Sequence, residues 1–423
     1  MIVSKNLFRF ALIPASTCLL LVMAGIGAQA AVWPVDAELT NVADADEFSW
    51  PLSYWEQATA SEVGLDNTKL EEARDYALTG GGSGYIIRHG KLVMSWGDSN
   101  KLYDLKSSTK SIGVTALGLA MLDGKIGLYD KAIERCPSLG VPPQSNKDSG
   151  WTEQITVQQL ATQTAGFEKP GGYSPLLFRP GTKWNYSDSG PNWLAECLLY
   201  VYRRDLRDLM FERVFTPLGI TNKDLVWRNH EYREPEINDI ANREFASGIS
   251  ADIDAMSRIG YLYLRRGRWN GQRIVSESFV DAASAPPADL IGLPVLNPER
   301  YGNASDHYGL LWWNNADGTL AGVPQDAYWS WGLYDSLIVV IPSLDIVVAR
   351  AGRTLNTNWW QRLSPNWTPD YNRLAPLLEP IAQSVVRIHD DEDNASSSQR
   401  RQMLNERFVL KKAINQLQYD TRT

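Results

Sequence analysis

The chain has 423 residues, of which 44% are hydrophobic, and it contains 32 Gly, 22 Pro and 16 Trp. This is the composition of a globular protein that is long enough for a large core and for two structural lobes. The net charge of −8 and the isoelectric point near 5.2 argue against a nucleic-acid-binding protein, which needs a basic face. The many Trp residues suit either a packed core or an aromatic-lined cleft.

The first 30 residues have the pattern of a secretory signal peptide. Lys5 and Arg9 provide a positive start, residues 11–26 are apolar, and Ala28-Gln29-Ala30 gives small residues at the cleavage positions. Cleavage would leave a mature chain from residue 31, so we expect a periplasmic or secreted protein. The alternative is an uncleaved anchor, but the apolar run is short for a full membrane span. No stable membrane insertion is therefore expected after cleavage.

Two cysteines remain in the mature chain, Cys136 and Cys197. An oxidising compartment permits a disulfide between them, but their spacing has no diagnostic pattern, so a bridge and two free buried thiols are both open. Neither cysteine has a Cys or His at metal-ligand spacing. We predict no metal site and no cofactor.

After a lead-in over residues 31–56, the periodicity of apolar residues separates helices from strands. The predicted helices are 67–78, 111–121, 157–162, 193–214 and 374–386. The predicted strands are 85–88, 92–96, 308–313, 336–341 and 346–349. The helix at 111–121 is apolar nearly all round, which is typical of a buried helix.

These elements predict a sheet assembled from both ends of the chain. The predicted fold class is α/β (α+β), with an antiparallel β-sheet flanked by N- and C-terminal helices and an inserted, mostly helical domain. The main domain spans 57–386. Residues 57–105 and about 241–386 form its α/β lobe, and residues from about 106 to 240 form its helical lobe.

The chain ends in a segment of different composition, over residues 387–423. An acidic, Ser-rich stretch begins it and reads as a solvated linker. Residues 399–418 then have apolar side chains at near-heptad spacing, which indicates an amphipathic helix. This tail is either loosely packed or disordered, or it docks a partner or supports self-association.

The first candidate for chemistry is Ser107-Ser108-Thr109-Lys110, at the start of the apolar helix. A hydroxyl and an amine three positions apart lie on one helix face, so Lys110 can accept the proton of Ser107. Free N–H groups and the helix dipole at this end also favour developing negative charge. An S-x-x-K match alone is weak, because a chain of this length contains about one by chance.

Two later segments carry complementary groups. Tyr186 lies in a Gly- and Ser-rich loop over residues 180–190, where a tyrosine near a lysine ammonium can shuttle a proton to a leaving group. Gly332 and Leu333 precede a predicted strand, and the N–H of Leu333 can complete an oxyanion hole with that of Ser107. Gly332 would allow close approach to the backbone. Each feature alone is unremarkable.

In order and context, the three segments resemble the class C β-lactamase-like serine hydrolases. This family includes penicillin-binding carboxypeptidases, family VIII esterases and 6-aminohexanoate-dimer hydrolase. The resemblance covers about 57–385 and extends to residues 104–112, 122–128, 155–166, 216–220 and 246–250. It implies an acyl-enzyme in which Ser107 is the nucleophile, Lys110 accepts its proton and Tyr186 is the proton shuttle. The resemblance also places the N–H groups of Ser107 and Leu333 in the oxyanion hole.

The sequence departs from this family at two places. Asp188 stands where the family usually has Asn, and Ser330-Trp331-Gly332 stands where β-lactamases have Lys-Thr-Gly and many esterases have His-x-Gly. The third motif therefore lacks the cation that helps to bind the carboxylate of penicillins. Asp188 would repel acidic substrates or would pair with Lys110. We expect Asp188, Ser330, Trp331 and Gly332 to bind a neutral or cationic ester or amide.

Three functions remain open. The first is an exported serine hydrolase that cleaves a carboxylic ester or amide, a small-molecule substrate, through acyl-Ser107. The second is a β-lactamase or D-alanyl carboxypeptidase. The third is a catalytically silent binding protein on the same fold, against which the presence of Ser107, Lys110 and Tyr186 together argues. The sequence has neither an H-E-x-x-H motif nor a G-x-S-x-G motif.

Overall fold

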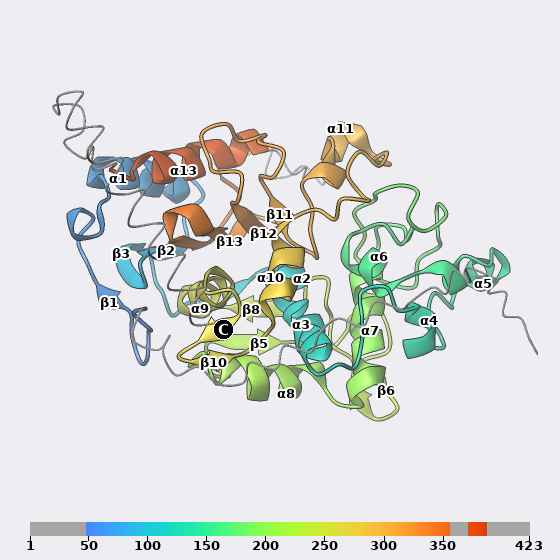
Figure 1. The fold of residues 1–423 in the computed structure, drawn as a ribbon. Coiled ribbons are helices and arrows are strands. Elements are labelled where there is room, and N and C mark those ends of the chain that lie inside the picture. Colours follow the sequence, from blue (N-terminus) through green and yellow to red (C-terminus); the bar gives the residue numbers. More distant parts are fainter. Residues whose placement is uncertain (1–47, 356–370, 387–423) are drawn as a thin grey trace, which may run out of the picture. The chain divides into compact units, whose positions relative to one another are not determined.

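A seven-stranded sheet forms the centre of the α/β lobe (Figure 1). The computed structural model describes residues 48–355 and 371–386, so the predicted signal peptide and tail helix lie outside the described residues. The order of the strands is β1-β3-β2-β14-β13-β12-β11. Their bounds are β1 Glu56–Gln57, β2 Ser83–Arg88, β3 Lys91–Trp96, β11 Trp313–Asn314, β12 Tyr328–Gly332, β13 Ser336–Ile341 and β14 Ile346–Ala351.

The two ends of the chain meet in the middle of this sheet. β2 pairs with β14 in antiparallel register from Ser83 opposite Ala351 to Arg88 opposite Ile346. All pairings in the sheet are antiparallel except that of β1 with β3. The predicted assembly of one sheet from the two ends of the chain is therefore confirmed.

Helices cover both faces of the sheet. α1 (Asn67–Leu78) and α13 (Tyr371–Gln383) pack together on one face, and α9 (Ile253–Leu264) packs on β13 and β14 from the other (Figure 1). Every residue of β13 and β14 is consequently buried, which explains why these strands are continuous apolar runs without alternation.

The inserted segment is mostly helical and supplies one strand of a small sheet. Its helices are α2 Ser108–Gly113, α3 Thr115–Leu122, α4 Ala132–Arg135, α5 Gln144–Asp148, α6 Val157–Ala161, α7 Ser189–Tyr202 and α8 Leu206–Met210. The short strands β4 (Tyr103–Asp104), β8 (Ile249–Ala251) and β5 (Leu225–Trp227) form an antiparallel sheet in that order. A hairpin of β6 (Glu236–Ile237) with β7 (Ile240–Ala241) and one of β9 (Arg268–Trp269) with β10 (Gln272–Arg273) lie in connecting segments. α10 (Glu277–Ser284) and α11 (Pro298–Tyr301) precede β11.

The helix predicted over 111–121 is divided at Val114 into α2 and α3, and two other predicted elements were wrong in extent. The helix expected over 193–214 is interrupted, because Arg203 adopts a left-handed conformation (φ 49°) and Asp205 then caps the start of α8. The strand expected over 308–313 is interrupted at Leu311 (φ 59°), so only Trp313 and Asn314 pair as β11. In both cases a residue with a left-handed backbone conformation interrupts the regular element.

Many tryptophan side chains and both described cysteines are buried in the core. Among the residues that the structure describes, seven Trp side chains are fully buried, so much of the high Trp content serves packing. Cys136 and Cys197 are free and buried, which is one of the two alternatives that the sequence left open. Within the described part of the chain, no helix is long and apolar enough to cross a membrane.

The close packing of α9 on the sheet predicts that a side chain at Gly260 destabilises the protein. A Cβ at this position would lie 2.7 Å from Val347 Cγ1 and 2.8 Å from Ile338 Cγ2, so Gly260→Ala should destabilise the protein by about 1–3 kcal/mol through overpacking. Urea unfolding would measure the difference. The control is Gly190→Ala in α7, where the nearest atom to the new Cβ lies at 3.7 Å. Equal stability of both variants would contradict the prediction.

Candidate active site

Ser107 lies at the turn that leads from β4 into α2. Lys106 just before it has a left-handed backbone (φ 51°), and Asp104 stabilises the turn by accepting a hydrogen bond from Lys106 N–H at 3.1 Å. Ser108 N–H donates to Leu105 O at 3.1 Å and closes the first turn of the helix. The Ser107 hydroxyl is therefore held at the N-terminal end of α2, where backbone N–H groups favour an oxyanion.

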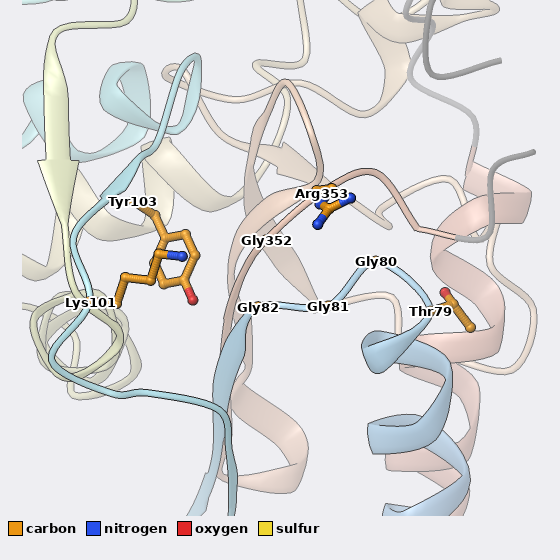
Figure 2. A pocket seen from close by; sticks show the side chains of 8 residues that line it. All are labelled: Thr79, Gly80, Gly81, Gly82, Lys101, Tyr103, Gly352 and Arg353. Atoms are coloured by element: carbon orange, nitrogen blue, oxygen red, sulfur yellow. The ribbon is translucent and has the colours of Figure 1, made fainter. Parts of the chain in front are cut away.

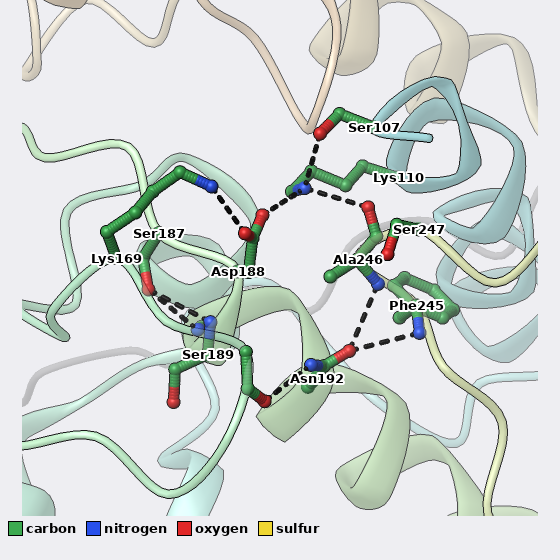
Figure 3. Close-up of polar contacts among 12 residues, drawn as sticks. Ser107, Lys110, Lys169, Ser187, Asp188, Ser189, Asn192, Phe245, Ala246 and Ser247 are labelled. Atoms are coloured by element: carbon green, nitrogen blue, oxygen red, sulfur yellow. Dashed lines mark hydrogen bonds and ion pairs between the residues drawn. The ribbon is translucent and has the colours of Figure 1, made fainter. Parts of the chain in front are cut away.

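The Lys110 ammonium makes three hydrogen bonds in this site (Figure 3). It donates to Ser107 Oγ at 3.1 Å, to Asp188 Oδ1 at 2.5 Å and to Ala246 O at 2.9 Å. These bonds use all three donors of an ammonium group. Its side chain is only 1% exposed, so these acceptors replace the solvation that burial removes. The predicted pairing of Ser107 with Lys110 is present in the structure.

Asp188 lies between two lysines. Its second carboxylate oxygen, Oδ2, accepts a hydrogen bond from Lys169, while Oδ1 accepts from Lys110 (Figure 3). Burial by itself would raise the pKa of this carboxyl, but the two ammonium groups outweigh it and lower the pKa to about 2. Asp188 is therefore ionised at neutral pH and its charge is balanced locally.

Ser187, and not Asp188, caps the N-terminal end of α7. Asp188 precedes α7 but makes no capping bond to it. Ser187 Oγ instead accepts from the N–H groups of Ser189 and Gly190, at 3.1 and 3.2 Å. Because Ser187 satisfies the helix end, the Asp188 carboxylate is available for the lysines.

The Tyr186 ring is held in an aromatic stack beside these charges. Its ring stacks on Tyr301 and on Trp313, with centroid distances of 5.6 and 5.8 Å. Burial raises the pKa of its hydroxyl well above 10, the charge of Asp188 raises it further, and a hydrogen bond with Ser107 partly opposes both. Tyr186 is therefore a neutral phenol at pH 7 and can donate a proton.

Asn192 links the two segments that carry the partners of Lys110 and Asp188. Its Oδ1 accepts from the N–H groups of Phe245 and Ala246, each at 3.0 Å, and its Nδ2 donates to Gly171 O at 2.8 Å (Figure 3). These bonds orient the Ala246 carbonyl toward Lys110 and hold the loop that follows Lys169. Asn192 is a positioning residue.

The third predicted motif lies at the end of β12, beside α2. A Cβ on Gly332 would come within 2.1 Å of Leu105 O and 3.1 Å of Ser108 N, so the end of this strand touches the start of the helix. Leu333 follows directly, next to the Ser107 turn. This proximity is compatible with an oxyanion hole formed by the N–H groups of Ser107 and Leu333, which remains a prediction.

The side chains of Ser330 and Trp331 are buried and form hydrogen bonds within the protein. Ser330 is fully buried, donates to Ser108 Oγ at 3.1 Å and accepts from Ile338 N–H at 2.9 Å. Trp331 is 1% exposed, and its ring N–H donates to Asp335 at 2.8 Å. The structure thus brings the backbone of this motif to the site, whereas both side chains face the interior. Their predicted contact with substrate is untested.

Two residues of the site escaped sequence reasoning, Lys169 and Asn192. Lys169 comes from a loop 19 positions before Asp188, and Asn192 from the first turn of α7. The signal for Lys169 was the unusual Asp188, whose two carboxylate oxygens can pair with a second cation besides Lys110. Nothing in the sequence indicated which lysine supplies it.

Two cavities lie near these elements. One of about 320 Å³ lies directly against Tyr186 and Lys169. Another of about 420 Å³ lies over the glycine loop at residues 80–82, with Lys101 and Tyr103 on one side and Arg353 on the other (Figure 2). The glycine-loop cavity shares no lining residue with the candidate site. Among the residues that the structure describes, no group of three Cys, His, Asp or Glu side chains could hold a metal ion.

Comparison with known proteins places the chain in a family. The model of the Beta-lactamase family matches residues 70–359, which is more than half of the chain, so the protein belongs to the Beta-lactamase family. The predicted family and fold are confirmed, and with them the class of enzyme, a serine hydrolase. A search of curated proteins finds no match to the sequence.

Several solved structures share this fold at low sequence identity. A novel penicillin-binding protein homolog from Caulobacter crescentus is 15% identical with a TM-score of 0.56, over 76% of this chain and 99% of that one. A putative 6-aminohexanoate-dimer hydrolase from Bacillus anthracis is 14% identical with a TM-score of 0.55, over 80% and 89%. A family VIII carboxylesterase is 16% identical with a TM-score of 0.53, over 74% and 98%.

The close approach of β12 to α2 predicts that a side chain at Gly332 lowers activity. In Gly332→Ala the new Cβ would collide with Leu105 O at 2.1 Å and Ser336 Oγ at 2.2 Å and would press on Ser108 N at 3.1 Å, which must separate the strand end from the helix. We expect the acylation rate with p-nitrophenyl acetate to fall by about 100-fold, the effect of losing one oxyanion donor. Gly127→Ala, whose Cβ would meet only the Asp130 side chain at 3.3 Å, serves as the control. An unchanged acylation rate in Gly332→Ala would be incompatible with this geometry.

The charge of Asp188 predicts a shift in pH dependence. Because this charge raises the pKa of Tyr186, Asp188→Asn should lower that pKa and move the Tyr186-controlled limb of the kcat/KM profile to lower pH by about 1 unit. The measurement is kcat/KM for a neutral anilide between pH 7 and 12, because the pKa of Tyr186 lies above 10. Asp281→Asn, which removes an exposed partner of Arg266, is the matched control. A shift to higher pH would refute the assigned coupling.

Proposed function

We propose that the protein is an exported serine hydrolase that cleaves a carboxylic ester or amide through an acyl-Ser107 intermediate. The observation that carries this proposal is the hydrogen bond from Lys110 to Ser107 Oγ, and the ring of Tyr186 lies beside the same lysine, 5.1 Å from Nζ to the ring centroid. A binding protein needs no such arrangement around a serine. Structural neighbours described as a carboxylesterase and a 6-aminohexanoate-dimer hydrolase support the choice of ester or amide.

The site residues suggest the order of the reaction. Ser107 Oγ attacks the substrate carbonyl carbon as its proton passes to the Tyr186 oxygen and the Tyr186 phenol proton passes to the leaving-group heteroatom, while Lys110 stays an ammonium that stabilises the negative charge. The N–H groups of Ser107 and Leu333 stabilise the oxyanion of the tetrahedral intermediate. Tyr186, which is a neutral phenol in the resting enzyme, supplies the proton that the leaving group takes when its bond to carbon breaks. Water then attacks the acyl carbon, and Ser107 regains its proton.

A β-lactamase or D-alanyl carboxypeptidase is the second candidate. Ser330 stands where those enzymes have a cation, and its hydroxyl is already bonded to Ser108 and to the Ile338 N–H. It therefore offers nothing to a substrate carboxylate at that point. This observation supports the ester or amide hydrolase over the β-lactamase. The proposed export rests on the signal-peptide pattern of residues 1–30.

Covalent labelling tests the proposal directly. Incubation with a fluorophosphonate probe should add one probe molecule to the intact protein, and Ser107→Ala should abolish the adduct while Ser108→Ala keeps it. The two serines are adjacent, but the Ser108 hydroxyl is buried and bonded to Ser336 O at 2.7 Å. Mass spectrometry of the intact protein measures the adduct. Labelling that survives Ser107→Ala would falsify the assigned nucleophile.

The same measurement separates the two candidate activities. With p-nitrophenyl esters we expect turnover, or a transient acyl adduct, that depends on Ser107. With nitrocefin we expect hydrolysis at least about 100-fold slower, because the third motif has no cation. Faster hydrolysis of nitrocefin than of the esters would favour the β-lactamase instead.

A further inference from the structure

The turn between β12 and β13 carries Leu333, the predicted second donor of the oxyanion hole. Residues 333–335 connect the two strands, and Asp335 N–H donates to Gly332 O at 3.0 Å across the turn. Tyr334 and Asp335 both have left-handed backbones, with φ of 71° and 57°. Glycine, asparagine and aspartate are the usual residues at such positions. A tyrosine keeps this conformation only where the surrounding structure holds it.

Arg350 holds this turn from β14. Its side chain is fully buried, and its Nη1 donates to Tyr334 O at 2.8 Å and to Asp335 O at 2.9 Å. These are the carbonyls of the two left-handed residues, so the guanidinium stabilises a conformation that the Tyr334 backbone by itself disfavours. Arg350 is paired with Leu337 in the sheet, so its backbone is fixed.

The other side of the Arg350 guanidinium is anchored to the backbone beyond the turn. Its Nη2 donates to Gly81 O at 3.3 Å and to Arg353 O at 2.5 Å. Gly80 and Gly352 leave room for this group, because a Cβ on them would lie 2.2 and 2.8 Å from Nη2. Both terminal nitrogens are therefore bonded to carbonyls, and the planar guanidinium is held in one orientation.

The side chain of Asp335 fixes the same turn from within. It is fully buried, and it accepts from the ring N–H of Trp331 at 2.8 Å and from Leu355 N–H at 2.9 Å. Burial lowers the pKa of Arg350 to about 10, and the carboxylate of Asp335 opposes this effect. Arg350 is therefore charged at neutral pH, and the two residues balance each other in the interior.

We propose that Arg350 and Asp335 are positioning residues of the oxyanion hole, which hold the turn so that Leu333 N–H stays beside Ser107 N–H. Both act through the backbone of the turn, because their side chains are fully buried. This inference rests on the proposed function, in which Leu333 N–H binds the oxyanion. It gives a role to a buried arginine in the otherwise apolar strand β14.

Arg350→Lys tests the first of these residues. Lysine keeps the charge, but its single nitrogen cannot bond to carbonyls on both sides, so the turn loses part of its support. We expect kcat for p-nitrophenyl acetate to fall by about 10- to 100-fold and KM to change by less than about threefold, the effect of a misplaced oxyanion donor.

Arg258→Lys is the matched control. Arg258 is also buried, and its Nη1 donates to the carbonyls of Pro51, Leu52 and Leu218, which belong to other segments of the chain. Urea unfolding should show a loss of stability in both variants. The kcat of Arg258→Lys, measured where it is folded, should equal that of the wild type.

Asp335→Asn tests the second residue and is decisive even where Arg350→Lys does not fold. The amide has one acceptor oxygen, so it cannot accept from both Trp331 and Leu355 as the carboxylate does. We expect kcat to fall by about 10-fold, again with little change in KM.

Infrared spectroscopy of acyl-Ser107 provides a readout that a loss of stability alone does not move. The protein is acylated with p-nitrophenyl trimethylacetate, with and without carbon-13 at the carbonyl, and the difference spectrum isolates the acyl carbonyl stretch. Hydrogen bonds in the oxyanion hole polarise this carbonyl and lower its frequency. Arg350→Lys and Asp335→Asn should therefore raise the frequency, whereas Arg258→Lys should leave it unchanged.

The outcomes separate this inference from the proposed function. An acyl carbonyl frequency equal to that of the wild type in the folded variants overturns the positioning role, with or without a fall in kcat, while acylation of Ser107 upholds the hydrolase. Failure of the wild-type protein to be acylated by the esters, together with no labelling by the fluorophosphonate, overturns the proposed function and this inference with it.

Discussion

The site depends on one carboxylate that serves two cations. Asp188 accepts from Lys110 through one oxygen and from Lys169 through the other, and Lys110 is buried beside Ser107. A buried ammonium is costly without a counter-charge, so Asp188 allows Lys110 to lie within hydrogen-bond distance of the nucleophile. The same charge raises the pKa of Tyr186. One side chain thus sets the electrostatics of every group proposed to move a proton.

Packing supplies the precision that this ion cluster needs. Tyr186 is fixed between Tyr301 and Trp313, and Asn192 holds both the Ala246 carbonyl and the loop that follows Lys169. These contacts are buried and close-packed, so the proton-transfer groups cannot drift apart without disturbing the core. The site is therefore built on the interface between the helical insertion and the sheet rather than on any single element.

In this site the third motif, Ser330-Trp331-Gly332, has a structural role through its first side chain. Ser330 replaces a cation of related enzymes, but its hydroxyl joins α2 to β12 and β13. A second lysine, Lys169, lies instead on the Asp188 side of the site and shares that carboxylate with Lys110.

The sequence by itself determined the family, the sheet built from both chain ends, and the pairing of Ser107 with Lys110. These follow from apolar periodicity and from residues a fixed distance apart on one helix, which are local properties. The tertiary structure alone decided that Lys169 completes the charge of Asp188, that Ser330 and Trp331 face the interior, and that Leu311 and Arg203 interrupt predicted elements. Those features depend on which distant segments meet, and burial and charge balance between such segments are not encoded in the spacing of residues along the chain.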